Sequence, residues 1–469
     1  MTGETIQSTE KTSSFDHLVL LIVVILALLV ALLIWRGDRA GVSVTARSPA
    51  PSAADASGLA SVRLRFGQAM DTGAVPDLQL ELAGSGAVTG TVYWEDDSTL
   101  ALRPATPLLP ETTYTVRLPA GAQSVTDRPL RQEQRWQFTT RSLRILYLDW
   151  DEQDRVQLYA VDLGGGEPQQ LTSAPLSVLD YALAPDGGTI VYSDQRQGGG
   201  SNLWQLSLER VTEGAGAQLL LDCGGDQCSG PSWDPQGRRL VYERRSFFSP
   251  DAPPGPPRLW WLDPQTAETT PLFDDSQLLG HTARFAGNGR WLSYIVPLEQ
   301  AMQVYNFETG EVIRLANEIG EPSAWHPWRA QLLSNNIQYQ GESFSVHIFR
   351  LDLPAGELTN LSSQSITNDA APAWSPSGDW IAFGRKVPRA PVGRQLWLMR
   401  PDGSQETALT DDLSSNFGPP SWSPSGQQIL VQRFSIEQPD SDPGIWLVDV
   451  DDGELHQVAG SGFQPSWLP

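Results

Sequence analysis

The pattern of hydrophobic and polar residues divides the chain into one long apolar run and many short alternating segments. From Leu18 to Trp35, eighteen residues follow one another without a charge. A helix of that length spans roughly 27 Å, which is close to the thickness of a bilayer core. We therefore predict a transmembrane helix over 18–35, preceded by a short N-terminal tail over 1–17.

A cleaved signal peptide is the alternative interpretation of the apolar run. Signal peptides usually carry an apolar region of about 7–15 residues behind a basic start. Residues 1–17 contain three acidic residues and only one Lys or Arg, Lys11, which favours an uncleaved anchor. Three arginines lie between 36 and 47, and the positive-inside rule would then place the C-terminal part in the cytoplasm.

The next two segments differ sharply in composition. Residues 36–57 are rich in Ala, Ser, Pro and Gly and are predicted to form a flexible linker, because they have few large apolar side chains to bury. Residues 58–141 contain short segments of alternating polarity separated by turn residues. Such segments predict strands, and six or seven of them in about 80 residues indicate a small β-sandwich. The inward positions predicted from the period-two alternation are Val62, Leu64, Phe66, Tyr114, Val116, Leu118, Trp136 and Phe138.

Motifs in this second segment give it a recognisable pattern. F-x-x-x-M-D is followed by V-x-G-x-V-x-W, T-L-x-L-x-P and W-x-F-T-T. The pattern resembles the bacterial Ig-like domain of surface-layer and envelope proteins, whose members are usually spacers or adhesion modules. The matching residues are Phe66, Met70, Asp71, Gly90, Trp94, Leu100, Pro104, Tyr114, Trp136 and Phe138.

The remainder, 142–469, repeats itself about every 47 residues, which is within the spacing of four-stranded propeller blades. The clearest copies are PAWSPSGDWIAFG from Pro372 and PSWSPSGQQILVQ from Pro420, each followed by a second pair of strand-like runs. The copies predict seven blades. The final PSWLP fragment would pair beside the first strands near Arg144 and close the ring, which removes open sheet edges.

The repeat resembles that of the TolB-like propellers, W-S-P-D-G-x-x-I-A-F followed by L-W-x-x-D and a closing L-T. Members of that family mostly act as protein-binding platforms in the cell envelope. This resemblance implies an extracytoplasmic location for the C-terminal domains, in conflict with the arginines at 36–47. Long domains translocate largely regardless of flanking charge, and we therefore favour the outside.

Charge and cysteine content narrow the choice of partners. With 32 basic and 55 acidic residues the net charge is -23, which excludes nucleic acid as a partner on electrostatic grounds. Cys223 and Cys228 lie close together in C-G-G-D-Q-C and are predicted to form a disulfide, with two free thiols as the alternative. No metal is predicted at Asp149, Asp151 and Asp154, because this group lacks the Gly and closing Glu of a calcium loop.

Propellers bind ligands through loops at the ends of their central channel. The connections between one blade and the next are rich in acidic residues and predict an acidic collar that binds Ca²⁺ or a basic peptide, with a merely solvated acidic surface as the alternative. Long loops inside the blades add arginines for partner contact. The candidate binding residues are Asp274, Asp275, Asp369, Asp411, Asp412, Arg244, Arg245, Arg385 and Arg389.

Together these features predict an all-β, membrane-anchored envelope protein that presents a propeller for binding, without a resident cofactor. The chain has no G-x-S-x-G, H-E-x-x-H or P-loop motif. The alternative is a hydrolase or lyase that acts on envelope polysaccharide with acidic residues at the channel mouth. A cytoplasmic sensor is a third interpretation, which the arginines at 36–47 favour.

Overall fold

The computed structural model describes most of the chain and divides it into two compact units. Unit 1 comprises residues 1–51, 62–103 and 115–137, and unit 2 comprises 52–61, 104–114 and 138–469. Nearly all regular structure in the described part of the chain is β-strand, which confirms the all-β prediction. The described residues are 14–38, 41–82, 86–208, 216–247, 253–275, 277–341, 343–362, 367–386, 393–438 and 440–469.

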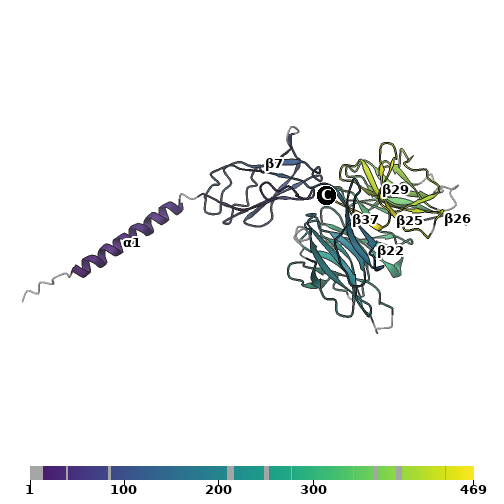
Figure 1. Cartoon of the computed structure of the whole chain (residues 1–469), viewed down its shortest axis with the longest axis horizontal. Helices are drawn as coiled ribbons and strands as arrows, with labels where there is room; N and C mark the ends of the chain where they lie inside the picture. The colour runs from purple at the N-terminus through teal and green to yellow at the C-terminus, as the bar shows by residue number, and fades with distance from the viewer. Residues whose placement is uncertain are drawn as a thin grey trace, which may run out of the picture. The chain divides into compact units, whose positions relative to one another are not determined.

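The one α-helix of the described residues is α1 (Ser14–Asp38), which covers the apolar run of the sequence (Figure 1). Its side chains from Leu18 to Ala31 are exposed. Among the residues that the structure describes, no helix is both long and apolar enough to cross a membrane. The prediction of a transmembrane helix over 18–35 is therefore not supported.

Two four-stranded sheets form a β-sandwich in the region predicted to be Ig-like. One sheet has the order β1-β2-β6-β5 and the other the order β4-β3-β7-β8. The predicted inward positions are buried, as Leu64, Val116 and Phe138 illustrate with at most 1% exposure. The strands are β1 (Val44–Ser48), β2 (Val62–Phe66), β3 (Gln79–Leu82), β4 (Gly86–Ala87), β5 (Gly90–Trp94), β6 (Thr99–Pro104), β7 (Thr113–Leu118) and β8 (Gln134–Thr139).

Strand β1 lies inside the range 36–57 that was predicted to be a flexible linker. It pairs antiparallel with β2, and the Trp136 indole donates a hydrogen bond to the Pro49 carbonyl at 3.0 Å. The linker prediction is therefore wrong for 44–48. A strand made mainly of small and polar residues is held by backbone hydrogen bonds, which its composition does not reveal.

Unit 2 is built from antiparallel groups of four or five strands, and the described residues contain seven such groups, which we number as blades 1–7 along the chain. A parallel bridge joins blades 2 and 3 into one eight-stranded sheet, and another joins blades 5 and 6. Blade 7 has five strands because its inner strand is divided in two, and blade 1 takes its inner strand from the end of the chain. Blade 1 contains β9 (Arg144–Trp150), β10 (Val156–Asp162), β11 (Gln169–Gln170) and β37 (Phe463–Leu468); blade 2 contains β12 (Val178–Leu183), β13 (Thr189–Gln195), β14 (Ser201–Ser207) and β15 (Gln218–Leu221); blade 3 contains β16 (Gln227–Trp233), β17 (Leu240–Arg245), β18 (Arg258–Leu262) and β19 (Thr269–Pro271); blade 4 contains β20 (His281–Phe285), β21 (Trp291–Val296), β22 (Ala301–Asn306) and β23 (Val312–Ala316), with a 3-10 turn at Pro297–Glu299; blade 5 contains β24 (Ala324–Trp325), β25 (Gln331–Gln340), β26 (Ser343–Asp352) and β27 (Glu357–Asn360); blade 6 contains β28 (Asn368–Trp374), β29 (Ile381–Lys386), β30 (Gln395–Met399) and β31 (Thr407–Ala408); blade 7 contains β32 (Ser415–Phe417), β33 (Ser421–Trp422), β34 (Gln428–Ser435), β35 (Gly444–Asp449) and β36 (Leu455–Ala459).

The last strand of the chain completes the first blade. β37 pairs antiparallel with β9, so the yellow end of the chain lies beside strands from the start of unit 2 (Figure 1). Hydrophobic clusters join each blade to the next, and a further cluster joins blade 7 to blade 1 through Ile145, Leu430 and Trp467.

The repeated tryptophan has a second role besides filling the core. In several blades its indole N–H donates to a backbone carbonyl of the preceding blade, as in Trp325 to Arg284 at 3.0 Å and Trp422 to Ala373 at 3.1 Å. Trp374 of blade 6 is an exception, because its buried indole N–H has no hydrogen-bond partner among the described residues. The Trp467 indole donates to the Ser421 carbonyl at 3.0 Å. The fragment PSWLP therefore holds blade 7 with its indole while its backbone pairs with blade 1.

We predict that Trp467→Ala destabilises unit 2 by about 3–5 kcal/mol, because it removes a large buried side chain at this joint. Trp467→Phe should cost less, since it keeps most of the packing and loses the hydrogen bond. Urea unfolding followed by circular dichroism measures both. Trp328→Ala is the control, because Trp328 is 51% exposed; equal losses at the two positions would contradict the prediction.

Candidate functional site

Two of the candidate binding residues, Asp369 and Arg385, form a buried ion pair. The Arg385 Nε and Nη2 donate to the two carboxylate oxygens of Asp369 at 2.7 and 2.8 Å. The exposed fractions of the two side chains are 4% and 0%, and Glu406 accepts from Arg385 at 2.7 Å. Burial alone would lower the pKa of Arg385, but the hydrogen bonds to Asp369 and Glu406 raise it. Arg385 is therefore held charged within the blade.

The same arrangement recurs in blades 3 and 7. Arg244 bonds Asp226 at 2.7 Å, and Arg433 bonds Asp412 at 2.5 Å. In blades 3, 6 and 7 this arginine also lies over a tryptophan ring of the third strand, at 4.5–5.1 Å from the ring centroid in each case, where a guanidinium is attracted to the ring face. The tryptophans are Trp260, Trp397 and Trp446.

Asp412 shows how such hydrogen bonds and ion pairs change the pKa of a carboxyl group. Burial works to raise the pKa of its carboxyl, but hydrogen bonds from Ser414, Ser415 and Arg433 outweigh burial and lower the pKa to about 2. The acidic collar predicted from the sequence is thus neutralised at Asp369 and Asp412 by arginines from the same blades. The sequence showed both groups of charges but not their pairing.

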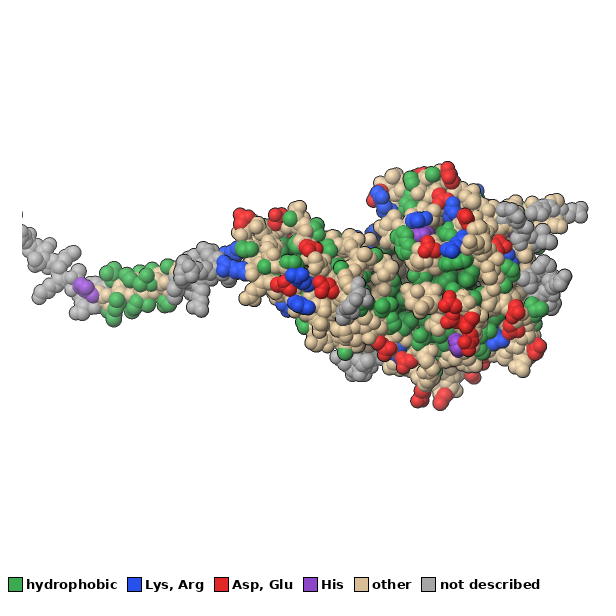
Figure 2. Space-filling view, turned by 90° about the horizontal axis from the view of Figure 1, so that it is seen from above, with side chains coloured by type: hydrophobic (Ala, Val, Ile, Leu, Met, Phe, Trp, Pro, Cys, Tyr) green, Lys and Arg blue, Asp and Glu red, His purple; other side chains and the backbone are tan. Residues whose placement is uncertain are grey.

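The other candidates are scattered. Asp274, Asp275 and Asp411 are exposed, in keeping with the acidic groups seen on the face of unit 2 in Figure 2. Arg245 approaches Glu243 at 3.5 Å. Arg389 lies outside the described residues. The candidates that the structure describes therefore do not form one site.

Three carboxylates outside the candidate binding residues hold one blade to the next. Asp180 of blade 2 accepts the backbone N–H of Gly230 in blade 3 at 2.6 Å, and Glu243 of blade 3 accepts that of Thr282 in blade 4 at 2.8 Å. Glu321, just before blade 5, accepts the N–H of Ala371 in blade 6 at 3.1 Å. We call Asp180, Glu243 and Glu321 the bridging carboxylates.

The accepted N–H groups share an unusual backbone. Gly230, Thr282 and Ala371 have φ between 48° and 60°, and each lies where the pairing of the inner strand shifts register. A bulge of this kind leaves an N–H without a partner in its own sheet, and the neighbouring carboxylate satisfies it. The register shifts at these three positions cannot be read from residue types, which explains why the bridging role of these carboxylates was not predicted.

Asp180 is the most perturbed of the bridging carboxylates. Burial raises its pKa to about 6, and the nearby Glu243 adds to the effect, against the hydrogen bonds from Ser193 and Gly230. Burial also raises the pKa of Glu243 and lowers that of Arg284, the cation that faces both acids.

A cavity of about 380 Å³ lies where blades 5, 6 and 7 meet, and one of about 620 Å³ adjoins it. Both are lined by Arg394, Asn416 and Phe434. The smaller cavity has walls of Pro322, Pro372, Pro419, Pro420 and Phe417, with Glu321 and Gln432 as polar groups. Apolar walls with a few converging polar groups are typical of ligand sites.

Arg394 is the distinctive group of these cavities. Its backbone N–H donates to the Asn416 side chain at 2.8 Å, which fixes the backbone on which its side chain stands. The Nε is buried without a hydrogen-bond partner among the described residues. Unlike Arg244, Arg385 and Arg433, it makes no ion pair within the described part of the chain.

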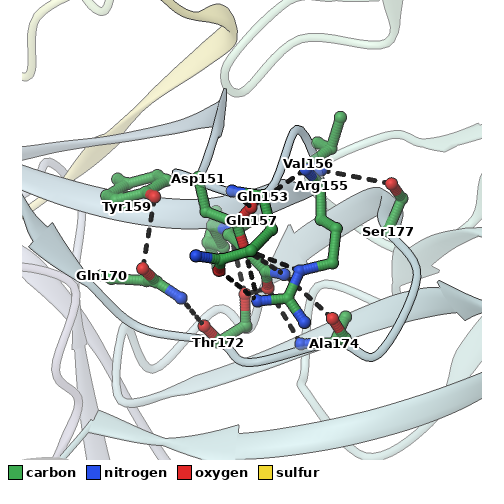
Figure 3. Close-up of polar contacts among 11 residues, drawn as sticks. Asp151, Gln153, Arg155, Val156, Gln157, Tyr159, Gln170, Thr172, Ala174 and Ser177 are labelled. Atoms are coloured by element: carbon green, nitrogen blue, oxygen red, sulfur yellow. Dashed lines mark hydrogen bonds and ion pairs between the residues drawn. The ribbon is translucent and has the colours of Figure 1, made fainter.

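The two cysteines form a disulfide, Cys223–Cys228, in the connection between blades 2 and 3, and both are buried. Asp151 lies in the segment for which no metal was predicted, and its carboxylate is engaged by hydrogen bonds from its own turn. It accepts the N–H groups of Gln153 and Arg155 at 2.9 Å each and the Arg155 Nε at 2.9 Å, as Figure 3 shows. Among the described residues, no three His, Cys, Asp or Glu side chains are grouped to hold a metal ion.

Figure 3 also shows a buried amide network next to this turn. Gln157 accepts the Thr172 hydroxyl at 2.9 Å, and Thr172 in turn accepts the Leu158 N–H at 2.9 Å. Gln395 and Thr410 repeat the arrangement in blade 6. The closing L-T of the repeat therefore satisfies a backbone donor inside the blade and has a structural role.

Comparisons with known proteins agree with the fold. Residues 38–140 match the family model described as a bacterial Ig-like domain, which confirms that resemblance. No curated protein matches the chain.

Similar solved structures include TolB from Acinetobacter baumannii, at 16% identity over 81% of this chain and 82% of that chain with a TM-score of 0.43. They also include an oligogalacturonate lyase from Vibrio parahaemolyticus, at 16% over 48% and 63% with a TM-score of 0.38. The β-propeller domain of the Trilobed protease from Pyrococcus furiosus is similar at 10% over 75% and 96%, with a TM-score of 0.46. At such low identity and TM-score, these likenesses assign neither an activity nor a partner.

We predict that Asp369→Ala destabilises unit 2 by about 3–5 kcal/mol, because it leaves the buried Arg385 without its main counterion. The double variant Asp369→Leu with Arg385→Met should be less destabilised than Asp369→Ala. Urea unfolding measures the difference. A double variant that loses as much as the single variant would show that charge pairing is not the cause.

A second prediction concerns pH. The pKa of Asp180 lies above its ordinary value of 3.8, at about 6, so the fold binds this proton more tightly than the unfolded chain does. Stability should therefore fall as pH rises from about 4 to about 6. In Asp180→Asn that part of the decline should vanish, whereas Asp186→Asn, in an exposed turn, should keep it. Urea unfolding at a series of pH values tests this.

Proposed function

We propose that unit 2 is a closed seven-bladed β-propeller that acts as a binding module outside the cytoplasm, with the adjoining cavities at blades 5–7 as its ligand site. The observation that carries this proposal is Arg394, a cation that lines both cavities and makes no ion pair within the described part of the chain. Its Nε is buried, so a ligand in the cavities would meet the outer nitrogens of the guanidinium group. An anionic ligand that accepts from these nitrogens would supply the counterion that the described residues do not provide.

Ring closure is supported by the pairing of β37 with β9 and by the cluster between blades 7 and 1. A closed ring holds blades 5, 6 and 7 at fixed positions, so the cavity walls are preformed. Preformed walls reduce the entropy that a ligand loses on binding.

An extracytoplasmic location is supported by the disulfide Cys223–Cys228, because such bonds persist in oxidising compartments and are rare in the cytosol. The bacterial Ig-like match over 38–140 agrees with the same location, since the resemblance was to envelope and surface-layer proteins.

A hydrolase or lyase acting on envelope polysaccharide is the second candidate. It is favoured by the raised pKa values of Asp180 and Glu243, which interact with one another, because perturbed carboxyl groups are frequent in glycosidase sites. If this candidate is correct, Asp180→Asn abolishes polysaccharide cleavage while leaving the fold intact.

The binding proposal is tested by a photo-crosslinking amino acid placed at Gln432, which lines the smaller cavity. We expect a discrete adduct in living cells. The matched control is Gln427, exposed in the turn before β34, which should give none. An absence of adducts at 432, or equal adducts at both positions, would contradict the proposal.

The location is tested by the redox state of the cysteines. Thiols in acid-quenched cells should react with a maleimide only after reduction. The substitution Cys223→Ser removes the disulfide and should lower the free energy of unfolding by about 2 kcal/mol, which is the chain-entropy contribution of so short a loop. Free thiols in untreated cells would overturn the extracytoplasmic location.

A further inference from the structure

Blade 6 departs from blades 3 and 5 at one position of its second strand. Glu243, Asn335 and Gly384 are equivalent, since each pairs with the residue before the aromatic of the third strand. Glu243 is a bridging carboxylate, and Asn335 donates to Glu321, another of them. Gly384 has no side chain, so the second strand of blade 6 contributes no polar group at this point.

The space above Gly384 is taken by Arg394. A Cβ at position 384 would lie 3.2 Å from the Arg394 Cδ and 3.5 Å from its Cβ. Glycine thus admits the arginine at a place where other blades carry a polar side chain. Any larger residue would displace the Arg394 side chain from the cavity wall.

The larger cavity is basic although the protein is acidic. Lys386 and Arg394 line it together with Asn416, Ser435 and Ile436, and the lining residues that the structure describes include no Asp or Glu. With 55 acidic residues against 32 basic ones overall, two cations that make no ion pair with any described residue form a local site for negative charge in this cavity.

We propose that this cavity binds the carboxylate of a ligand, with Arg394 and Lys386 as its cationic partners and the apolar part of the ligand against Phe434. This inference rests on the proposed function and names the chemistry of its site. The planar guanidinium fork matches the two oxygens of a carboxylate. Inorganic phosphate has no apolar part that could pack against Phe434.

The experiment titrates the purified full-length protein with succinate, inorganic phosphate and the neutral amide succinamide, followed by ligand-observed NMR. We expect succinate to bind most tightly and succinamide not at all. In Arg394→Gln the dissociation constant for succinate should rise by about tenfold or more, the loss expected for a charged hydrogen bond. Lys386→Gln should weaken binding in the same direction.

Arg258→Gln is the matched control, because Arg258 is an exposed arginine at the start of the third strand of blade 3 and should leave succinate binding unchanged. Circular dichroism verifies that each variant is folded. If Arg394→Gln is unfolded, Gly384→Leu, which blocks the arginine from the wall, replaces it.

Phosphate binding more tightly than succinate, or succinate binding that survives Arg394→Gln and Lys386→Gln, would overturn the inference. An adduct at position 432 together with either of these results would support the proposed binding function and contradict only the carboxylate as its ligand. Succinate binding that depends on Arg394, without an adduct at position 432, would support the carboxylate site and contradict the proposed binding function.

Discussion

The need of each blade to bury both of its faces is the constraint on which unit 2 depends most. A four-stranded sheet cannot bury both of its faces alone, so each blade needs a neighbour at a fixed distance. The apolar clusters between blades attract without specifying direction. The bonds of Trp325, Trp422 and Trp467 add direction, because an N–H donor must meet its carbonyl in line.

The bridging carboxylates answer a constraint set by the bulges of the inner strands. Each of these bulges leaves a backbone N–H that faces the preceding blade. Asp180 and Glu243 accept these donors at 2.6 and 2.8 Å. Their raised pKa values show that the charged form is held in a poorly solvated place. The ring is therefore joined by polar contacts as well as by apolar ones.

The sequence predicted the parts of this structure that depend on local pattern. Period-two alternation identified the inward residues of the sandwich, and the W-S-P motif located the blade repeats. The sequence pattern did not predict β1, because its small residues give no apolar signal. It also did not predict the pairing of Asp369 with Arg385, which lie 16 positions apart. Charge content alone suggested an open acidic collar. Which charges face one another is decided by strand register, and that information is not local.

The position of the cavity follows from the same reasoning. Regular repeats fill their junctions in regular ways, so a site can form only where one copy differs from the others. Gly384 is such a difference, and Arg394 occupies the space that it opens. A side chain like those of blades 3 and 5 would bring its Cβ to 3.2 Å from the Arg394 Cδ. The glycine therefore leaves room at this junction for a cation that makes no ion pair within the described part of the chain.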